Sequence, residues 1–216
     1  MSLLLAIDTS GRSGGIALAR YEGEFAVVLA HEHITGGTFS AELIPQLDAL
    51  LAQQQLSLND VSAIGVITGP GSFTGLRIGL AAVKGLCEAR PLPIVPVTML
   101  ELMASAAQAA RVTTILDAGR SEAYVGVFTL QDGIAQADSE ELVRITEIDV
   151  KGLGLTPDTT IARAVSAIEV PRPGAADLAV YAVRKLARGS KCAADALDAT
   201  YIRRSDAELF SKPRSS

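Results

Sequence analysis

The feature that most restricts the fold of this chain is a strand–turn–strand pattern that occurs twice. It spans residues 3–19 and again residues 112–130. In each copy an apolar strand ends in an aspartate, Asp8 or Asp117, and a Gly-Arg-Ser turn leads into a second apolar strand. Self-similarity of this kind indicates an internal duplication. We therefore expect two related halves.

The first half continues with a third strand and then alternates helices with strands. The expected elements are strands at 3–8, 15–19, 25–34, 61–68 and 94–97, and helices at 39–55, 73–89 and 99–110. Alternation after an antiparallel meander implies a mixed sheet with helices on its faces. This order fits the ribonuclease-H-like core that actin, sugar kinases and Hsp70 chaperones share.

The second half shows weaker patterns than the first. Residues 151–173 are rich in Gly, Pro and Thr with little periodicity, and only residues 175–187 predict a helix. We therefore predict an α/β, actin-like ATPase (ribonuclease-H-like) fold with two lobes of duplicated βββαβα-type units. The N-terminal lobe would span 1–110, and a reduced C-terminal lobe 111–216.

Composition and charge narrow the functional classes. The 216-residue chain is 49% hydrophobic and 20% charged, which suffices for an ordinary folded core. Its formal net charge is −5, whereas a chain that binds nucleic acid alone usually carries a basic face. Basic residues gather only at 184–188 and 203–214. Any contact with RNA is therefore expected to be made through a partner.

The cysteines and the apolar segments predict a cytoplasmic location. Cys87 and Cys192 are far apart and match no metal-binding spacing, so we expect two reduced thiols. The sequence starts without a basic leader, and no apolar run reaches the roughly 18 residues that a membrane span requires. We expect no membrane segment.

The acidic strand ends raise the question of a nucleotide site. In actin-like ATPases an Asp at the end of the first strand orients a magnesium-bound water, and a second, glycine-rich turn wraps a phosphate. Ala118 and Arg120 stand where the second turn would need glycine. A strand-end Asp can instead accept hydrogen bonds from turn amides. We predict at most a degenerate anion or nucleotide site, made of Asp8, Thr9, Ser10, Ser72 and Arg120.

The most distinctive stretch is Gly-Pro-Gly-Ser-Phe-Thr-Gly at residues 69–75. It follows a predicted strand and opens a predicted helix, whose free amides and dipole favour an anion. It is not a P-loop, because no Lys follows, nor a nucleophile elbow, because Pro70 stands where that motif has Gly. Two functions stay open: Ser72 or Thr74 caps the helix, or the loop binds an anion.

The remaining side chains do not compose a catalytic centre. His31 and His33 lie two apart in a strand pattern, and two ligands alone make a weak metal site. No Ser–His–Asp or Cys–His set can be assembled from the sequence with a physical reason. We therefore predict no catalytic residue, no metal and no cofactor.

The helix predicted over 73–89 has two apolar stripes, whereas a surface helix needs only one. The first stripe consists of Leu76, Leu80, Val83 and Cys87. The second consists of Gly75, Ile78, Ala82, Leu86 and Ala89. Two apolar faces imply a helix between its own sheet and something else. That neighbour is either the helix over 39–55 or a second protein, and the pattern alone leaves both open.

Four segments of the chain together resemble one protein family. They are residues 4–10, 69–79, 117–124 and 201–204. They are similar to the TsaB (YeaZ-like) family, for which the Gly-Pro-Gly-Ser-Phe-Thr-Gly-Leu-Arg sequence is highly specific. The resemblance spans nearly the whole chain and is weakest between 134 and 173. A sister family, the catalytic TsaD subunits, shares the fold but carries a metal-binding His-x-x-x-His pair, which this sequence lacks.

The resemblance implies a non-catalytic subunit of the bacterial machinery that makes threonylcarbamoyladenosine on tRNA. Such subunits pair with a TsaD-like catalytic subunit through the first two helices of the N-terminal lobe. A TsaE-like ATPase joins them, and tRNA is bound only through the complex. Alone, these subunits often form homodimers through the same helices. We therefore expect a partner interface made of Phe39, Leu43, Leu47, Ile78, Ala82 and Leu86.

One position departs from the family pattern. The family usually has His-Ser or His-Thr at the start of the first helix, where this chain has Phe39-Ser40. A pairing helix can use Phe equally well. Two alternative functions remain: an actin-like nucleotide-binding ATPase or kinase, and a glycoprotease-like hydrolase, which would need a nucleophile–base pair.

Overall fold

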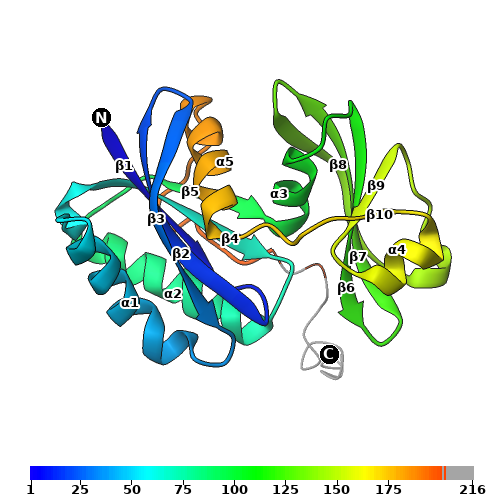
Figure 1. The fold of residues 1–216 in the computed structure, drawn as a ribbon, viewed down its shortest axis with the longest axis horizontal. Coiled ribbons are helices and arrows are strands. Elements are labelled where there is room, and N and C mark those ends of the chain that lie inside the picture. Colours follow the sequence, from blue (N-terminus) through cyan, green and yellow to red (C-terminus); the bar gives the residue numbers. More distant parts are fainter. Residues whose placement is uncertain (201, 203–216) are drawn as a thin grey trace, which may run out of the picture.

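The computed structural model describes residues 1–200 and 202, and it contains two five-stranded sheets built on one plan (Figure 1). The first sheet has the order β3-β2-β1-β4-β5, and the second has the order β8-β7-β6-β9-β10. In each, the first three strands in the chain are antiparallel, and the next two run parallel to the first. The strands are β1 (Ser2–Asp8), β2 (Ser13–Glu22), β3 (Phe25–Thr35), β4 (Val61–Gly69), β5 (Ile94–Thr98), β6 (Arg111–Gly119), β7 (Glu122–Gln131), β8 (Ile134–Arg144), β9 (Leu153–Thr156) and β10 (Ile168–Glu169).

The helices follow a similar order in both halves, but in the second half one is replaced by a short turn and another is shortened. They are α1 (Phe39–Gln53), α2 (Phe73–Ala89), α3 (Met99–Ser105), α4 (Thr159–Val165) and α5 (Ala175–Ala187), with short 3₁₀ turns η1 (Leu58–Asp60) and η2 (Ile145–Glu147). The turn η2 stands where α1 stands in the first half, and α4 has 7 residues where α2 has 17. The predicted actin-like (ribonuclease-H-like) fold, with duplicated units and a reduced second lobe, is confirmed.

The first sheet is covered on both faces, which explains the continuous apolar run of β1. Leu5 and Ile7 pack in a cluster with α1 and α2, whereas Leu4 and Ala6 pack in a second cluster with α5. Because successive side chains of a strand point to opposite faces, α1 and α2 lie on one face of this sheet and α5 on the other (Figure 1).

Several elements of the second half were not predicted from the sequence. The edge strand β8 exposes most of its side chains, so it lacks the apolar alternation of a half-buried strand. The strand β9 and helix α4 are too short for periodicity to show, although Asp158 caps α4 by accepting a hydrogen bond from the Ile161 amide at 2.8 Å. The helix predicted to reach residue 110 ends at Ser105.

Two helices exchange sheets. The helix α3 follows β5 of the first sheet but packs on β6, β7 and β8, while α5 follows the second sheet and packs on β1, β2 and β3. One apolar cluster accordingly contains Val97 of the first sheet, Phe128 of the second and Leu178 of α5. The division after residue 110 stays a prediction about the chain, since the two halves share this core.

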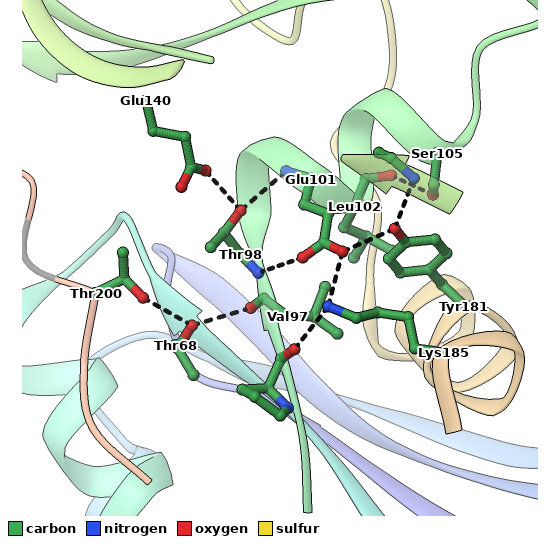
Figure 2. Close-up of polar contacts among 12 residues, drawn as sticks. Thr68, Val97, Thr98, Glu101, Leu102, Ser105, Glu140, Tyr181, Lys185 and Thr200 are labelled. Atoms are coloured by element: carbon green, nitrogen blue, oxygen red, sulfur yellow. Dashed lines mark hydrogen bonds and ion pairs between the residues drawn. The ribbon is translucent and has the colours of Figure 1, made fainter. Parts of the chain in front are cut away.

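A buried polar cluster joins the exchanged helices (Figure 2). Glu101 lies on α3, whereas Tyr181 and Lys185 lie on α5. Glu101 Oε1 accepts a hydrogen bond from the Tyr181 hydroxyl at 2.8 Å and forms an ion pair with Lys185 Nζ at 2.7 Å. Lys185 also donates to the carbonyl oxygen of Pro96 in β5 at 3.0 Å, and the Tyr181 hydroxyl accepts from the Ala135 amide in β8 at 3.1 Å. The Glu101 and Lys185 side chains are 12% and 13% exposed, so the cluster links both sheets away from solvent.

The start of α3 is tied to the second sheet through Thr98. Its hydroxyl accepts a hydrogen bond from the Glu101 amide at 3.0 Å and donates to Glu140 Oε1 in β8 at 2.8 Å (Figure 2). Burial raises the pKa of Glu140; the hydrogen bond from Thr98 lowers it, and the neighbouring Glu101 charge adds to the rise. The helix cap and the contact between sheets thus share one hydroxyl.

Replacing Lys185 with Met is expected to lower the free energy of unfolding by about 3 kcal/mol, because Glu101 would keep its charge in a buried site without its cation. The matched control is Arg184→Met, which removes a charge from the exposed side of the same helix. Urea unfolding of both variants at pH 7 measures the difference. Equal midpoints for the two variants would contradict the assignment of Lys185 to a buried pair.

Candidate functional site

A cavity of about 890 Å³ opens where the turns of the two sheets face each other. Its first-half wall comes from the β1–β2 turn and the starts of α1 and α2, and its second-half wall comes from the end of β6 and from β7. Its lining includes Ser10, Gly11, Gly71, Ser72, Asp117 and Arg172. This is the place at which the sequence predicts a degenerate anion or nucleotide site.

The two strand-end aspartates form the same turn in both halves. Asp8 Oδ1 accepts hydrogen bonds from the Ser10 amide at 2.8 Å and the Ser10 hydroxyl at 2.6 Å. Asp117 Oδ1 accepts from the Gly119 amide, also two residues on, at 2.8 Å. Asp8 is only 2% exposed and does not line the cavity, so its carboxylate is engaged in the turn. The repeated turn supports the duplication inferred from the sequence.

The glycines at 71, 75 and 79 serve close backbone packing. A Cβ at Gly71 would lie closer than 3.0 Å to the carbonyl oxygen of Ser10, and a Cβ at Gly75 would meet that of Thr9. A Cβ at Gly79 would meet the Thr9 hydroxyl. The spacing of four places Gly75 and Gly79 on one face of α2, pressed against the β1–β2 turn, and Gly71 meets the same turn just before the helix begins. The glycines of this stretch therefore allow α2 to pack closely against the β1–β2 turn of the first sheet.

Two backbone amides at the start of α2 are engaged inside the chain. The Ser72 amide donates to the Ser10 carbonyl oxygen at 2.7 Å, and the Gly75 amide donates to the Ser72 hydroxyl at 3.2 Å. The Thr9 hydroxyl in turn donates to the Gly75 carbonyl oxygen at 2.8 Å. Of the two functions left open by the sequence, the structure shows Ser72 as the helix cap. An anion bound at this loop stays a prediction.

The predicted site residues are only partly brought together. Ser10 and Ser72 line the cavity side by side, with Thr9 buried behind them. Arg120 has a positive φ of 57° in the β6–β7 turn and is not among the residues that line the cavity. Sequence reasoning missed Arg172, whose Nη2 donates to the Ser10 hydroxyl at 2.9 Å. The only local signal for it is its position between two prolines in a segment without periodicity.

Part of the predicted partner interface is corrected by the structure. Phe39, Leu43 and Leu47 are 2–3% exposed and belong to the core between α1 and the first sheet. They repeat at the spacing of a helix face, and that face is the one that turns inward. These three side chains are therefore unavailable to a second protein. Ile78, Ala82 and Leu86 are half-buried against the same core, so α1 partly covers the second stripe of α2.

Comparison with known proteins identifies the family. A protein-family model described as TsaD, tRNA N6-adenosine threonylcarbamoyltransferase, matches residues 33–201. The tRNA threonylcarbamoyladenosine biosynthesis protein TsaB of Haemophilus influenzae is 38% identical over 125 residues, 56% of this chain and 51% of that protein. The chain belongs to this family, in its TsaB (YeaZ-like) branch.

Other TsaB relatives and a solved structure agree with this placement. The TsaB protein of Bacillus subtilis is 33% identical over 62% of this chain and 58% of that protein. The chain thus spans little more than half the length of these two relatives in sequence. The structure of YeaZ from Pseudomonas aeruginosa superimposes with a TM-score of 0.78 and 29% identity, covering 93% of this chain and all of that one. Of the segment 201–204 that shares the resemblance, only Ile202 lies within the described residues.

In this TsaB-branch chain, the outward side of α1 and α2 combines apolar and small residues with charged ones, among them Arg77, Lys84 and Glu88 of α2. Ile44 of α1 is 46% exposed and Phe73 at the start of α2 is 42% exposed, with the guanidinium of Arg77 stacked 3.8 Å from its ring. Ala81 and Gly85 lie on the exposed side of α2. This outward surface, defined here by Ile44, Phe73, Ala81 and Gly85, is called the helix-pair face.

The features expected of other functions are sparse in the part of the chain that the structure describes. Within residues 1–200 and 202, no three His, Cys, Asp or Glu side chains gather as a metal site, and both histidines are exposed on β3. None of the helices in these residues combines the length and apolar character that crossing a bilayer requires. Cys87 and Cys192 are both free thiols.

Two glycines of α2 provide a matched test of the packing. Gly75→Ala is expected to lower the free energy of unfolding by about 3 kcal/mol, because the new Cβ meets backbone that cannot move aside. Gly85→Ala, on the same helix, meets nothing within 4 Å and should raise stability by up to about 1 kcal/mol. Urea unfolding of the two variants measures both effects. A similar rise in both variants would show that Gly75 is not held against the turn.

Proposed function

We propose that this chain is a non-catalytic subunit that activates a TsaD-like catalytic subunit in the synthesis of threonylcarbamoyladenosine on tRNA. Its relatives carry the name tRNA threonylcarbamoyladenosine biosynthesis protein TsaB, and the matching family model is that of the threonylcarbamoyltransferase TsaD. The activity would lie in the partner, and this chain would act by pairing with it.

The observation that carries the proposal is that one side of α2 is held inside the chain while the other side is exposed. The start of α2 is held within the chain by the Ser72 cap and by the contacts to Thr9 and Ser10. Its opposite side leaves Ala81 and Gly85 exposed, and small side chains let a second helix approach closely. The helix is thus fixed on one side, and its exposed side combines small residues with the charged Arg77, Lys84 and Glu88, a mixture that suits a binding subunit.

The helix-pair face and the net charge of the chain bear on two further partners, a second copy of the chain and tRNA. We propose that the helix-pair face also supports a homodimer when the chain is alone, and that binding of the catalytic subunit replaces the second copy. A TsaE-like ATPase would join the pair. With a formal net charge of −5, the chain is poorly suited to hold tRNA unaided, so tRNA would bind through the complex.

Reconstitution tests the role directly. The catalytic, ATPase and adenylate-forming partners are incubated with tRNA, with and without this chain, and threonylcarbamoyladenosine is quantified by mass spectrometry of digested tRNA. Product is expected only when the chain is present, and the chain alone should form none. Equal product without it would refute the activating role, and hydrolysis of ATP by the isolated chain would favour the ATPase alternative.

A charge on the helix-pair face tests the mode of pairing. Ala81→Glu places a carboxylate on the exposed side of α2 and is expected to weaken binding of the TsaD-like subunit roughly hundredfold, because the longer, charged side chain would stand where a partner helix has to approach closely and would lose its water there. Ala82 is unsuitable because it is half-buried against its own core. The control is Ala187→Glu at the exposed end of α5. Binding is measured by calorimetry, with unfolding midpoints as a check; unchanged affinity would exclude this face.

A further inference from the structure

The linker between β10 and α5 carries one charged side chain into the opposite half of the molecule. Arg172 stands between Pro171 and Pro173, and its Nη2 donates a hydrogen bond to the Ser10 hydroxyl at 2.9 Å. A Cβ at Gly11 would lie only 3.3 Å from the guanidinium, so that position leaves room for the arginine. Residues 162 positions apart in the sequence meet here.

Arg172 also separates two hollows. It lines the 890 Å³ cavity described above, and it lines a second cavity of about 600 Å³ whose walls include Leu102 of α3, Leu155 of β9 and Val180 of α5. Its Nε is buried and has no hydrogen-bond partner among the described residues. The guanidinium thus lies in the wall between the two cavities. Its Nη2 is hydrogen-bonded to Ser10 of the β1–β2 turn.

The charge of Arg172 affects the buried Asp8 carboxyl, which belongs to the β1–β2 turn that Arg172 contacts. The pKa of Asp8 is raised overall, because burial outweighs the lowering by the Arg172 charge and by the hydrogen bonds from Ser10. A carboxylate that is 2% exposed needs a nearby cation to remain charged at low cost. In this chain that cation is a side chain of the other half, reached through the Ser10 hydroxyl.

We propose that Arg172 is a built-in counter-ion that locks the two sheets in one orientation without a bound ligand. The Asp8–Ser10–Arg172 chain of contacts joins the β1–β2 turn of the first sheet to the linker that leaves the second sheet. The Glu101 cluster is a second attachment between the sheets (Figure 2). Two bodies joined at two separate places cannot rotate freely about either.

This lock goes beyond the proposed function, because it concerns how the cavity is held and not which partner binds. A protein whose sheets are set by its own side chains presents its surfaces in a fixed geometry whether or not a nucleotide is available. The competing explanation is that Arg172 waits for an anionic ligand, and in that case ligand should be needed to order the turn. The two explanations differ in what the isolated wild-type chain does.

Hydrogen exchange read by mass spectrometry tests the lock. Arg172→Met removes the charge and keeps an apolar stem, and Arg184→Met, which also lines the second cavity, is the control. The first variant should exchange amides of residues 9–12 and 171–174 roughly tenfold faster than wild type and show a larger radius of gyration in X-ray scattering, while the control changes neither. Unchanged exchange and radius in Arg172→Met would overturn the proposal.

Two further arms keep the test decisive. If Arg172→Met fails to fold, Ser10→Ala, which removes the acceptor for Arg172 together with one hydrogen bond to Asp8, should still speed exchange in the linker; no change there would overturn the lock. Calorimetry with magnesium and ATP should detect no binding to the wild-type chain. Binding that Arg172→Met abolishes would show that Arg172 is a ligand of the nucleotide, not a lock. None of these readouts involves tRNA or the catalytic partner, so the lock and the proposed function can fail separately.

Discussion

The arrangement of the first half depends on a contact in which backbone meets backbone with no side chain between. The turn after β1 presses the carbonyl oxygens of Thr9 and Ser10 against the start of α2, and only glycine at 71 and 75 leaves room for them. The contact fixes the height and rotation of α2 on the sheet. It also uses the Ser72 amide and the Thr9 hydroxyl, groups that in a Gly-rich loop of this kind could otherwise bind a phosphate. The same contact therefore decides which side of α2 is left for another protein.

The two halves are one body because α3 and α5 exchange sheets. The exchange places Glu101 of α3 beside Lys185 of α5 in a site from which water is largely excluded. Such a pair adds little net stability compared with apolar residues, but it is costly to break, and its hydrogen bonds from Tyr181 and to Pro96 are directional. The shared apolar core supplies the attraction between the halves, while this cluster and the Arg172 contact set the angle at which they meet.

The duplication is unequal, and the inequality bears on function. The first half keeps two long helices on one face of its sheet, whereas the second half has the turn η2 and the seven-residue α4 in the corresponding places. Within the described residues the first half offers the broader helical surface, and it is there that Ile44 and Phe73 are exposed. The proposed role as a pairing subunit uses the half that has both long helices, and the second half supplies the other wall of the cavity.

The sequence by itself determined the local elements and the plan that repeats. Period-two and period-3.6 apolar patterns, with turn residues between them, predicted the bounds of α2 and the strand–turn–strand units that end in Asp8 and Asp117, because these depend on neighbours a few residues away. It could not show that Phe39, Leu43 and Leu47 face the core while Ile44 faces outward, since an apolar stripe looks the same against its own sheet or a partner. Nor could it find β8, whose edge position frees it from alternation. Only the tertiary structure decided that Arg172 reaches Ser10 and that Glu101 meets Lys185, because contacts between residues so distant in the chain depend on where the chain returns.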